Sequence, residues 1–207
     1  MVLTKEDFRQ MVLTSARLLK EHVDTLCEID SSFGDGDHGV TMDKISTVMI
    51  DSASSWKDES IEAFFVKLCE DVMGTNGGSA GPLYGSFFEG FGEGASGLET
   101  IDESGLKKMF NEALANLRFI SKAQIGEKTM MDALLPTIEV ANTSTSPLPE
   151  LLDEIAKAAE QGAEDSKKYV AKYGRARFFK EQTIGFMDAG AYSMKLIIEG
   201  FAKGIRD

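Results

Sequence analysis

The stretch Asp30-Ser31-Ser32-Phe33-Gly34-Asp35-Gly36-Asp37-His38-Gly39 separates two helical patterns and places three carboxylates within eight positions. Carboxylate oxygens are hard ligands of the kind that Mg²⁺ or Ca²⁺ prefers. The glycines allow the sharp turns that would bring Asp30, Asp35 and Asp37 to one point. Their charges would repel one another there unless a cation lay between them. The same composition is also typical of an acidic, solvated turn between two helices.

An EF-hand calcium loop is excluded, because it needs Gly at its sixth position and Glu at its twelfth. Counted from Asp30, those positions hold Asp35 and Thr41; counted from Asp35, they hold Val40 and Ser46. We therefore favour a metal shared with a phosphate ligand, since Mg²⁺ is usually held by one or two carboxylates together with substrate phosphates.

The composition of the 207-residue chain limits the classes of function. Acidic residues outnumber basic ones by 34 to 22, a formal charge of −12, which argues against binding to nucleic acid or to anionic lipid. Cys27 and Cys69 form no CxxC motif, so we expect free thiols in a reducing compartment. The N-terminal residues lack a signal-peptide pattern and no apolar run reaches membrane-spanning length. These features predict a cytoplasmic protein.

Apolar residues at helical spacing recur along the chain, and no stretch shows sustained alternation. Thr4 is expected to cap the first helix, which runs into the acidic loop, while helices starting near Ser60 and after Asp102 follow. A helix from Leu83 and a long seventh helix running toward Tyr173 are also predicted. The pattern indicates one all-α domain, residues 1–207, built as an up-down bundle or barrel of about eight antiparallel amphipathic helices.

Three further stretches lie between helices. The loop 76–85 opens into a helix at Pro82, so its backbone N–H groups would favour an anion such as phosphate; alternatively, it is a plain linker. In 126–132, Thr129 is expected to cap the next helix. In 174–177, Arg175 could fork onto phosphate, or it could complement a helix dipole behind a C-terminal glycine.

Topology favours the functional reading of these stretches. In an up-down bundle alternate loops share an end, and the four stretches fall between helices one and two, three and four, five and six, and seven and eight. The acidic loop, the glycine loop and the arginine should therefore meet on one rim of the bundle.

Five motifs, in order and nearly spanning the chain, resemble the nucleotide-binding L subunit of dihydroxyacetone kinase. They are Asp30 with 34–39, then 77–85, 126–132, 174–176 and 188–191. The resemblance implies a barrel of eight antiparallel helices with ADP or ATP at its open end and two Mg²⁺ ions on Asp30, Asp35 and Asp37. It implies that Arg175 faces the phosphates as the catalytic residue. The other implied nucleotide contacts are His38, Gly39, Val40, Thr41, Gly78, Ser79, Ala80, Ser121, Thr129, Met130, Gly190, Ala191 and Tyr192.

The resemblance also implies partners. Family members phosphorylate a small ketose bound to a histidine of a separate K subunit, and neither His22 nor His38 lies in such a context here. In phosphotransferase-system members ADP stays bound and is rephosphorylated by a phosphohistidine M subunit, which is the reading we favour. The alternatives are free ATP as donor, with dihydroxyacetone or a related ketose such as erythrulose as acceptor, and a nucleotide-bound docking partner of a transcription regulator. A homodimer or hetero-oligomer is expected.

Four positions depart from the family pattern. Thr41 replaces a frequent Asn, Ile45 replaces a common Gly, Ser79-Ala80 inverts the usual order, and Ser121 replaces a typical Gly. The first and third departures lie at positions that contact phosphate in the family, so the sequence does not identify the phosphate donor or the ketose. The three aspartates match the family pattern.

Overall fold

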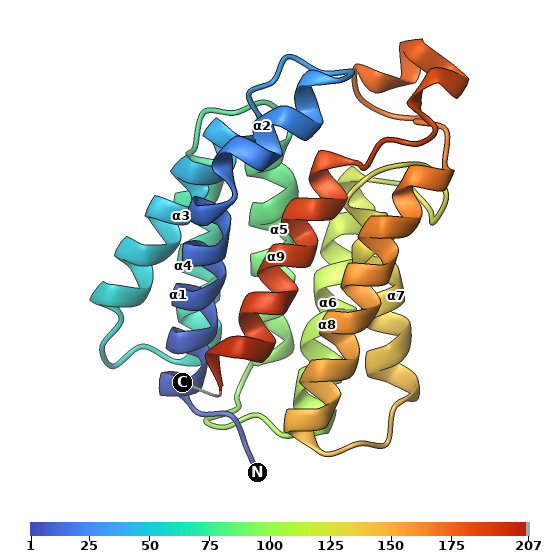
Figure 1. Ribbon diagram of the computed structural model, residues 1–207. Coiled ribbons are helices and arrows are strands. Elements are labelled where there is room, and N and C mark those ends of the chain that lie inside the picture. Colours follow the sequence, from blue (N-terminus) through green and yellow to red (C-terminus); the bar gives the residue numbers. More distant parts are fainter. Residues whose placement is uncertain (206–207) are drawn as a thin grey trace.

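The fold is seen in a computed structural model that describes residues 1–205 (Figure 1). Nine α-helices and two 3₁₀ helices make up this part of the chain, and its only β-pairing is the isolated bridge between Leu3 and Ile101. The helices are α1 (Lys5–Glu21), α2 (Val23–Ser31), α3 (His38–Ser55), α4 (Ile61–Met73), α5 (Ala80–Gly94), α6 (Glu103–Ile120), α7 (Met131–Thr143), α8 (Leu148–Asp165), η1 (Ser166–Lys168), η2 (Ala176–Thr183) and α9 (Ala189–Gly204).

The long helices form a closed ring. Each packs against the next in the order α1, α3, α4, α5, α6, α7, α8 and α9, and α9 returns to α1. The short helix α2 continues beyond α1 and leans on α3 and α9. The predicted all-α barrel of antiparallel helices is thus confirmed.

Local sequence signals explain where several helices begin. Thr4 and Asp7 form a reciprocal capping box at the start of α1. Ser60 and Asp102 accept hydrogen bonds from backbone N–H groups in the first turns of α4 and α6. Such caps satisfy N–H groups that have no partner inside the helix, and all three were expected from the sequence.

The first helix does not run unbroken into the acidic loop as predicted, because it stops at Glu21 and α2 begins at Val23. At the break, the backbone N–H of His22 bonds to the carbonyl of Leu19. The His22 ring Nδ1 lies 2.8 Å from the Leu18 carbonyl, the acceptor that a continuous helix would use for the backbone. The imidazole therefore takes the place of one backbone hydrogen bond at the break between α1 and α2.

Two other predicted boundaries were wrong. Helix α5 begins at Ala80 rather than Leu83, so Pro82 occupies its first turn, where a missing N–H costs no helical bond. Helix α8 ends at Asp165 instead of running toward Tyr173. The Ser166 hydroxyl lies 2.6 Å from the Ala163 carbonyl and satisfies that acceptor at the helix end.

Pro136 lies inside α7 without ending it. The proline removes the N–H that would bond to the Asp132 carbonyl. That carbonyl faces Gly162 of α8 so closely that a Cβ on Gly162 would lie 2.1 Å from it. The backbone of α8 at Gly162 therefore packs directly against the carbonyl that Pro136 leaves without its helical hydrogen bond.

The small residues of α5 allow close packing in the same way. A Cβ added at Gly90 would lie 2.3 Å from the Glu112 carbonyl, and one at Gly94 would lie 2.3 Å from the Met109 Cα, both in α6. Close packing against α6 is therefore the reason for glycine at these two positions, while Gly92 allows the same approach to α4, where a Cβ would lie 2.8 Å from that of Phe65. Trp56 has a packing role, because its ring stacks on Phe64 at a centroid distance of 4.0 Å.

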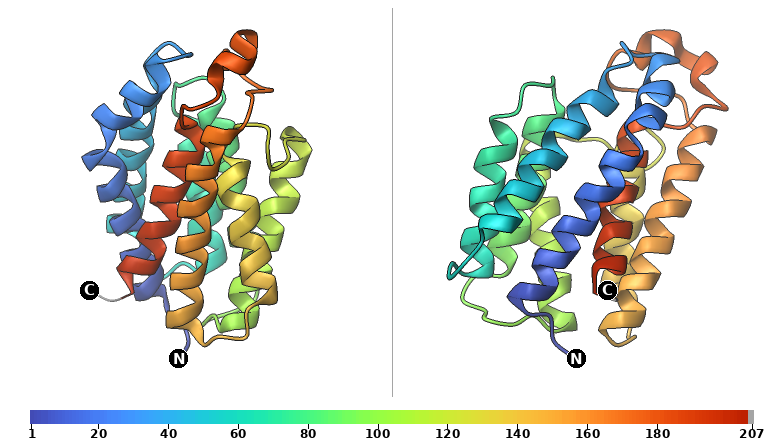
Figure 2. Two further views of the ribbon diagram at one scale, coloured as in Figure 1. Left: turned by 45° about the vertical axis from the view of Figure 1, so that its right-hand side comes forward. Right: turned by 60° about the vertical axis from the view of Figure 1, so that its left-hand side comes forward.

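One end of the barrel gathers α2, the loop 32–37 and the segment 166–188, and the start of α1 and the end of α9 lie at the opposite end (Figures 1 and 2). Within residues 1–205, neither cysteine forms a disulfide. In the same residues no helix combines the length and apolar character that crossing a membrane would need.

Candidate functional site

The three aspartates of the acidic loop come together as predicted. One carboxylate oxygen from each of Asp30, Asp35 and Asp37 lies within 4.8 Å of the others. Asp30 is half-buried and the other two are exposed. An all-oxygen, triply anionic donor set on a solvent-facing loop matches what Mg²⁺ prefers, and open space beside it leaves room for water or phosphate oxygens.

The loop holds this geometry through Asp30 itself. Its carboxylate accepts hydrogen bonds from the backbone N–H groups of Gly36 at 2.9 Å and Asp37 at 3.1 Å. Gly36 has φ of +74°, a conformation that glycine adopts without strain. A Cβ on Gly34 would lie 2.1 Å from Asp30 Oδ1. The glycines between the aspartates are therefore required for the three carboxylates to converge.

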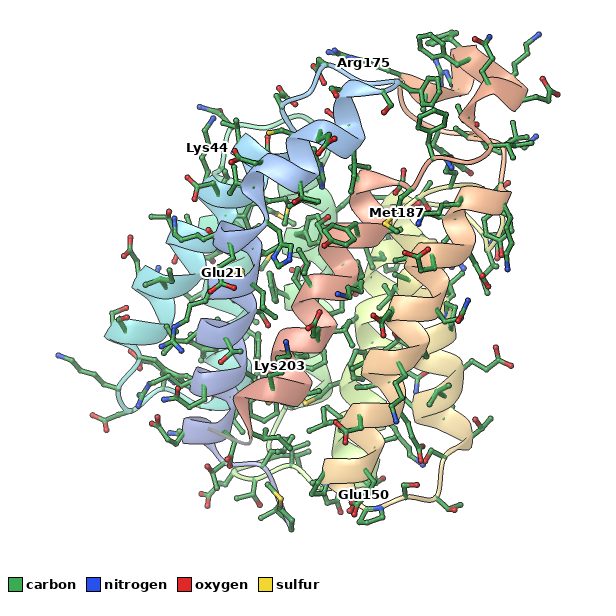
Figure 3. All side chains as sticks on the ribbon, in the orientation of Figure 1. Glu21, Lys44, Glu150, Arg175, Met187 and Lys203 are labelled. Atoms are coloured by element: carbon green, nitrogen blue, oxygen red, sulfur yellow. The ribbon has the colours of Figure 1, made fainter. Side chains whose placement is uncertain are left out.

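Arg175 reaches the same loop from a distant part of the sequence. Its guanidinium pairs with the carboxylate of Asp35, and Figure 3 shows Arg175 beside the acidic loop at this end of the barrel. The ring of Phe33, within the loop, packs on Phe179 and Phe186 at centroid distances of 5.1 and 5.0 Å. The segment that carries the arginine is thus anchored on the acidic loop by aromatic contacts as well as by charge.

The glycine loop before α5 lies against the first turn of α3. A Cβ at Gly77 would lie 2.2 Å from Thr41 Cγ2, and Lys44 Nζ donates to the Asn76 carbonyl at 3.3 Å. Gly78 has φ of +60° and nothing near its Cβ position. Of the next two predicted residues, Ser79 is exposed at the α5 N-cap, whereas Ala80 is buried.

The stretch before α7 is held by Asp132 rather than capped by Thr129 as predicted. The Asp132 carboxylate accepts from the N–H groups of Gly126 at 2.6 Å and Thr129 at 2.7 Å. The Thr129 hydroxyl accepts from Met131 N–H at 3.2 Å, but the N-cap residue is Met130, which is buried. A longer side chain inside the first turn reaches back to more of the loop than a threonine can.

The start of α9 lies against that stretch. A Cβ on Gly190 would be 3.3 Å from the Met130 backbone nitrogen. Asp188 caps α9 by accepting from Ala191 N–H at 2.8 Å. Burial raises the pKa of Asp188 to about 7, although the bond from Ala191 and the nearby Lys128 ammonium oppose the rise.

Lys128 links its own segment, before α7, to Ser166 and to Phe186 through hydrogen bonds. Its ammonium donates to the Ser166 carbonyl at 2.7 Å and to the Phe186 carbonyl. Burial lowers its pKa, while Asp188 and Asp132 partly oppose that shift. No role for Lys128 was predicted from the sequence. Its position inside the motif 126–132, two residues after Gly126, was the one sequence feature that could have indicated a role.

A buried chain of polar groups also went unpredicted. His38 Nε2 lies 2.9 Å from Ser193 Oγ, and Ser193 Oγ lies 2.7 Å from the Tyr84 hydroxyl. The Tyr84 hydroxyl also lies 3.3 Å from the Gly190 carbonyl. Burial lowers the pKa of His38, against the opposing effect of the Asp30 and Asp37 charges.

The remaining predicted residues occupy three places. Gly39, Val40 and Thr41 form the first turn of α3 after His38, and Ala191 and Tyr192 form the first turn of α9. Ser121 is the C-cap of α6, and its hydroxyl accepts from Ala123 N–H at 3.3 Å. Among the described residues, none of the contacts above joins Ser121 to the acidic loop.

The fold and this rim define an all-α barrel with a cluster of three carboxylates that could hold a metal ion, beside glycine-rich loops and an arginine. The sequence model of the DAK2 domain matches residues 32–203, and the chain belongs to the DAK2 domain family. It is 31% identical to the ADP-binding subunit DhaL of PEP-dependent dihydroxyacetone kinase 2 from Listeria innocua, with 99% of each chain covered. It is also 31% identical to the ADP-binding subunit DhaL of the PTS-dependent dihydroxyacetone kinase from Lactococcus lactis, covering 87% of this chain and 88% of that one.

A solved structure supports the fold. The dihydroxyacetone kinase of C. freundii, crystallised in complex with AMP-PNP and Mg²⁺, superposes with a TM-score of 0.73 at 23% identity. The alignment covers 94% of this chain but 33% of that one, so this chain corresponds to about a third of the crystallised polypeptide.

Proposed function

We propose that this chain is the ADP- or ATP-binding phosphoryl-transfer subunit of a dihydroxyacetone kinase. It would form a single domain over residues 1–207 that passes phosphate to a ketose held on a separate K subunit. The observation that carries the proposal is the convergence of Asp30, Asp35 and Asp37 with Arg175 at the glycine-lined end of the barrel. Membership of the DAK2 family and the names of the full-length relatives support it.

Asp30, Asp35 and Asp37 are the residues that would hold Mg²⁺, two ions by family resemblance. Bound there, Mg²⁺ would neutralise phosphate oxygens and so lower the cost of the charge that develops during transfer. The chain's own contribution is to keep the three carboxylates in register through the backbone bonds to Asp30. It thereby fixes the site before any ligand arrives.

The nucleotide would lie across the N-terminal ends of four helices. Helix N-termini present unpaired N–H groups and a partial positive charge, which favour phosphate. The residues assigned to it are His38, Gly39, Val40 and Thr41 of α3, Gly78, Ser79 and Ala80 at α5, Thr129 and Met130 at α7, and Gly190, Ala191 and Tyr192 of α9, with Ser121 on the adenosine side.

Arg175 is the proposed catalytic residue. Its side chain is 66% exposed and is held next to the acidic loop by the pair with Asp35. A guanidinium can donate two parallel hydrogen bonds to a phosphate group. Arg175 would stabilise negative charge on the phosphoryl group while its aromatic-anchored segment limits how far it moves.

The donor and the partners follow from the same assignment. We favour a phosphotransferase-linked subunit that retains ADP as a cofactor and receives phosphate from a phosphohistidine M subunit, as the names of the two relatives support. Exchange of free ATP, with dihydroxyacetone or erythrulose as the acceptor, is the alternative. Native mass spectrometry separates the two, because retained ADP with Mg²⁺ supports the first and an empty site supports the second.

Turnover with a purified K subunit tests the function. Asp35→Asn should lower phosphoryl transfer by a factor of about 100 or more, while the far-ultraviolet circular dichroism stays helical. Asp51→Asn is the matched control, because Asp51 is an exposed aspartate near the far end of α3, and it should retain wild-type turnover. Wild-type turnover by Asp35→Asn would refute the metal assignment. A wild-type chain that binds protein partners but transfers no phosphate would instead favour a docking role, such as binding a transcription regulator.

A further inference from the structure

Three helices are joined inside the barrel mouth by His38, which the proposed function assigns to the nucleotide, and by Ser193 and Tyr84, which it does not use. Tyr84 of α5 is 1% exposed and Ser193 of α9 is fully buried. Ser193 Oγ lies between the Tyr84 hydroxyl at 2.7 Å and His38 Nε2 of α3 at 2.9 Å. Because α1 lies between α3 and α9 in the ring, these hydrogen bonds link helices that are not consecutive in it.

We assign the direction of each bond by counting protons. The Ser193 hydroxyl has one proton, and we place it on the carbonyl of Ala189 at 2.9 Å, which is nearer than that of Gly190 at 3.1 Å, because a carbonyl can only accept. The two lone pairs of Ser193 Oγ are then free to accept from the Tyr84 hydroxyl and from an Nε2–H of His38. This assignment gives both buried hydroxyls a partner, as burial requires, and it makes His38 the Nε2–H tautomer.

We propose that Tyr84 and Ser193 are positioning residues for nucleotide binding, which they serve by locking the His38 ring and thereby the start of α3 onto the start of α9. The inference rests on the proposed function, since both helix starts carry residues assigned to the nucleotide. His38 opens α3 directly after Asp37, and the Gly190 carbonyl, 3.3 Å from the Tyr84 hydroxyl, belongs to the α9 turn. The hydrogen bonds therefore fix the spacing between two of the helix starts that would contact the nucleotide.

The tautomer of His38 is a direct readout that needs no nucleotide. The chain has two histidines, and His22 is an internal reference of opposite type, because its Nδ1 faces a carbonyl and must carry the proton. Nitrogen-15 spectra of the wild-type chain should show one Nε2–H and one Nδ1–H imidazole. Ser193→Ala should shift the His38 signals toward a mixture and leave those of His22 unchanged. A wild-type His38 in the Nδ1–H form would overturn the proposal.

Affinity for ADP with Mg²⁺ tests the consequence. Tyr84→Phe removes one oxygen and Ser193→Ala one hydroxyl, and each should weaken binding by a factor of about five or more. The double variant should bind ADP only slightly more weakly than either single variant, because the two residues act through the same row of hydrogen bonds. Ser15→Ala is the matched control: it deletes a buried hydroxyl that also bonds to α9, at the Ile197 carbonyl, away from the rim. Ser15→Ala should destabilise the protein about as much as Tyr84→Phe or Ser193→Ala does, but it should keep wild-type affinity for ADP with Mg²⁺.

The outcomes separate the two proposals. If the wild-type chain binds ADP with Mg²⁺ and Tyr84→Phe stays within twofold of it, the positioning role is refuted and the proposed function stands. Equal weakening by Ser15→Ala would also refute it, because loss of any buried hydroxyl would then suffice. A wild-type chain that binds no nucleotide refutes the proposed function, and the histidine spectra still decide whether the hydrogen-bond chain exists.

Discussion

Asp37→Asn should stabilise the ligand-free protein and weaken its response to ligand. The Asp37 carboxylate lies within 4.8 Å of those of Asp30 and Asp35. At that separation, two like charges in a water-like dielectric repel by about 0.9 kcal/mol. Asp37 is the N-cap of α3 but makes no capping hydrogen bond through its side chain, so the substitution breaks no bond within the folded chain.

The net gain is smaller than the repulsion removed. Relief of two repulsive pairs contributes about 1.8 kcal/mol, and loss of a negative charge at the α3 N-terminus costs about 0.3–1 kcal/mol. We expect the variant to be more stable by about 1 kcal/mol in excess chelator. For a chain of this length that raises Tm by about 2–4 °C.

The response to ligand should change in the opposite direction. Ligand at 100 times its Kd stabilises a protein by about 2.7 kcal/mol, and a variant that lacks one of three metal ligands should lose most of that gain. The assay is thermal unfolding followed at 222 nm, in chelator and in ADP with Mg²⁺. Asp51→Asn should match the wild type within about 0.5 kcal/mol in both conditions. If Asp37→Asn lowers Tm in chelator and keeps the full ligand response, the reasoning fails.

Three other predictions follow from the site. Burial raises the pKa of Asp188 to about 7, so between about pH 4 and pH 7 the folded chain keeps a proton that the unfolded chain releases. The free energy of unfolding should therefore fall as pH rises through that range. Urea unfolding of Asp188→Asn should lack this pH dependence. Gly77→Ala, whose Cβ would meet Thr41 at 2.2 Å, should lose about 1–3 kcal/mol of stability and bind ADP weakly by calorimetry. Arg175→Gln should lower turnover in the reconstituted kinase by a factor of about 100, whereas Arg177→Gln, a control on the same segment, should not.

The sequence alone determined the helices and the chemistry of the loops. Periodic apolar residues and capping residues such as Thr4, Ser60 and Asp102 act locally, so they are readable without tertiary contacts. The up-down topology then required the acidic loop and Arg175 to share an end, and the pairing of Arg175 with Asp35 agrees. The glycines around Asp35 were equally informative, because their conformational freedom is a property of the residue itself.

Only the tertiary structure decided the features that depend on contacts across the barrel. The break at His22 arises from its ring replacing a backbone bond. The loop before α7 is held by the Asp132 carboxylate, which accepts from Gly126 and Thr129, and not by a Thr129 cap. The chain from Tyr84 through Ser193 to His38 joins residues up to 155 positions apart, and no local pattern encodes such a pairing. Hydrogen bonds between distant residues depend on which helices the closed ring places face to face, and that arrangement is a property of the packed core as a whole.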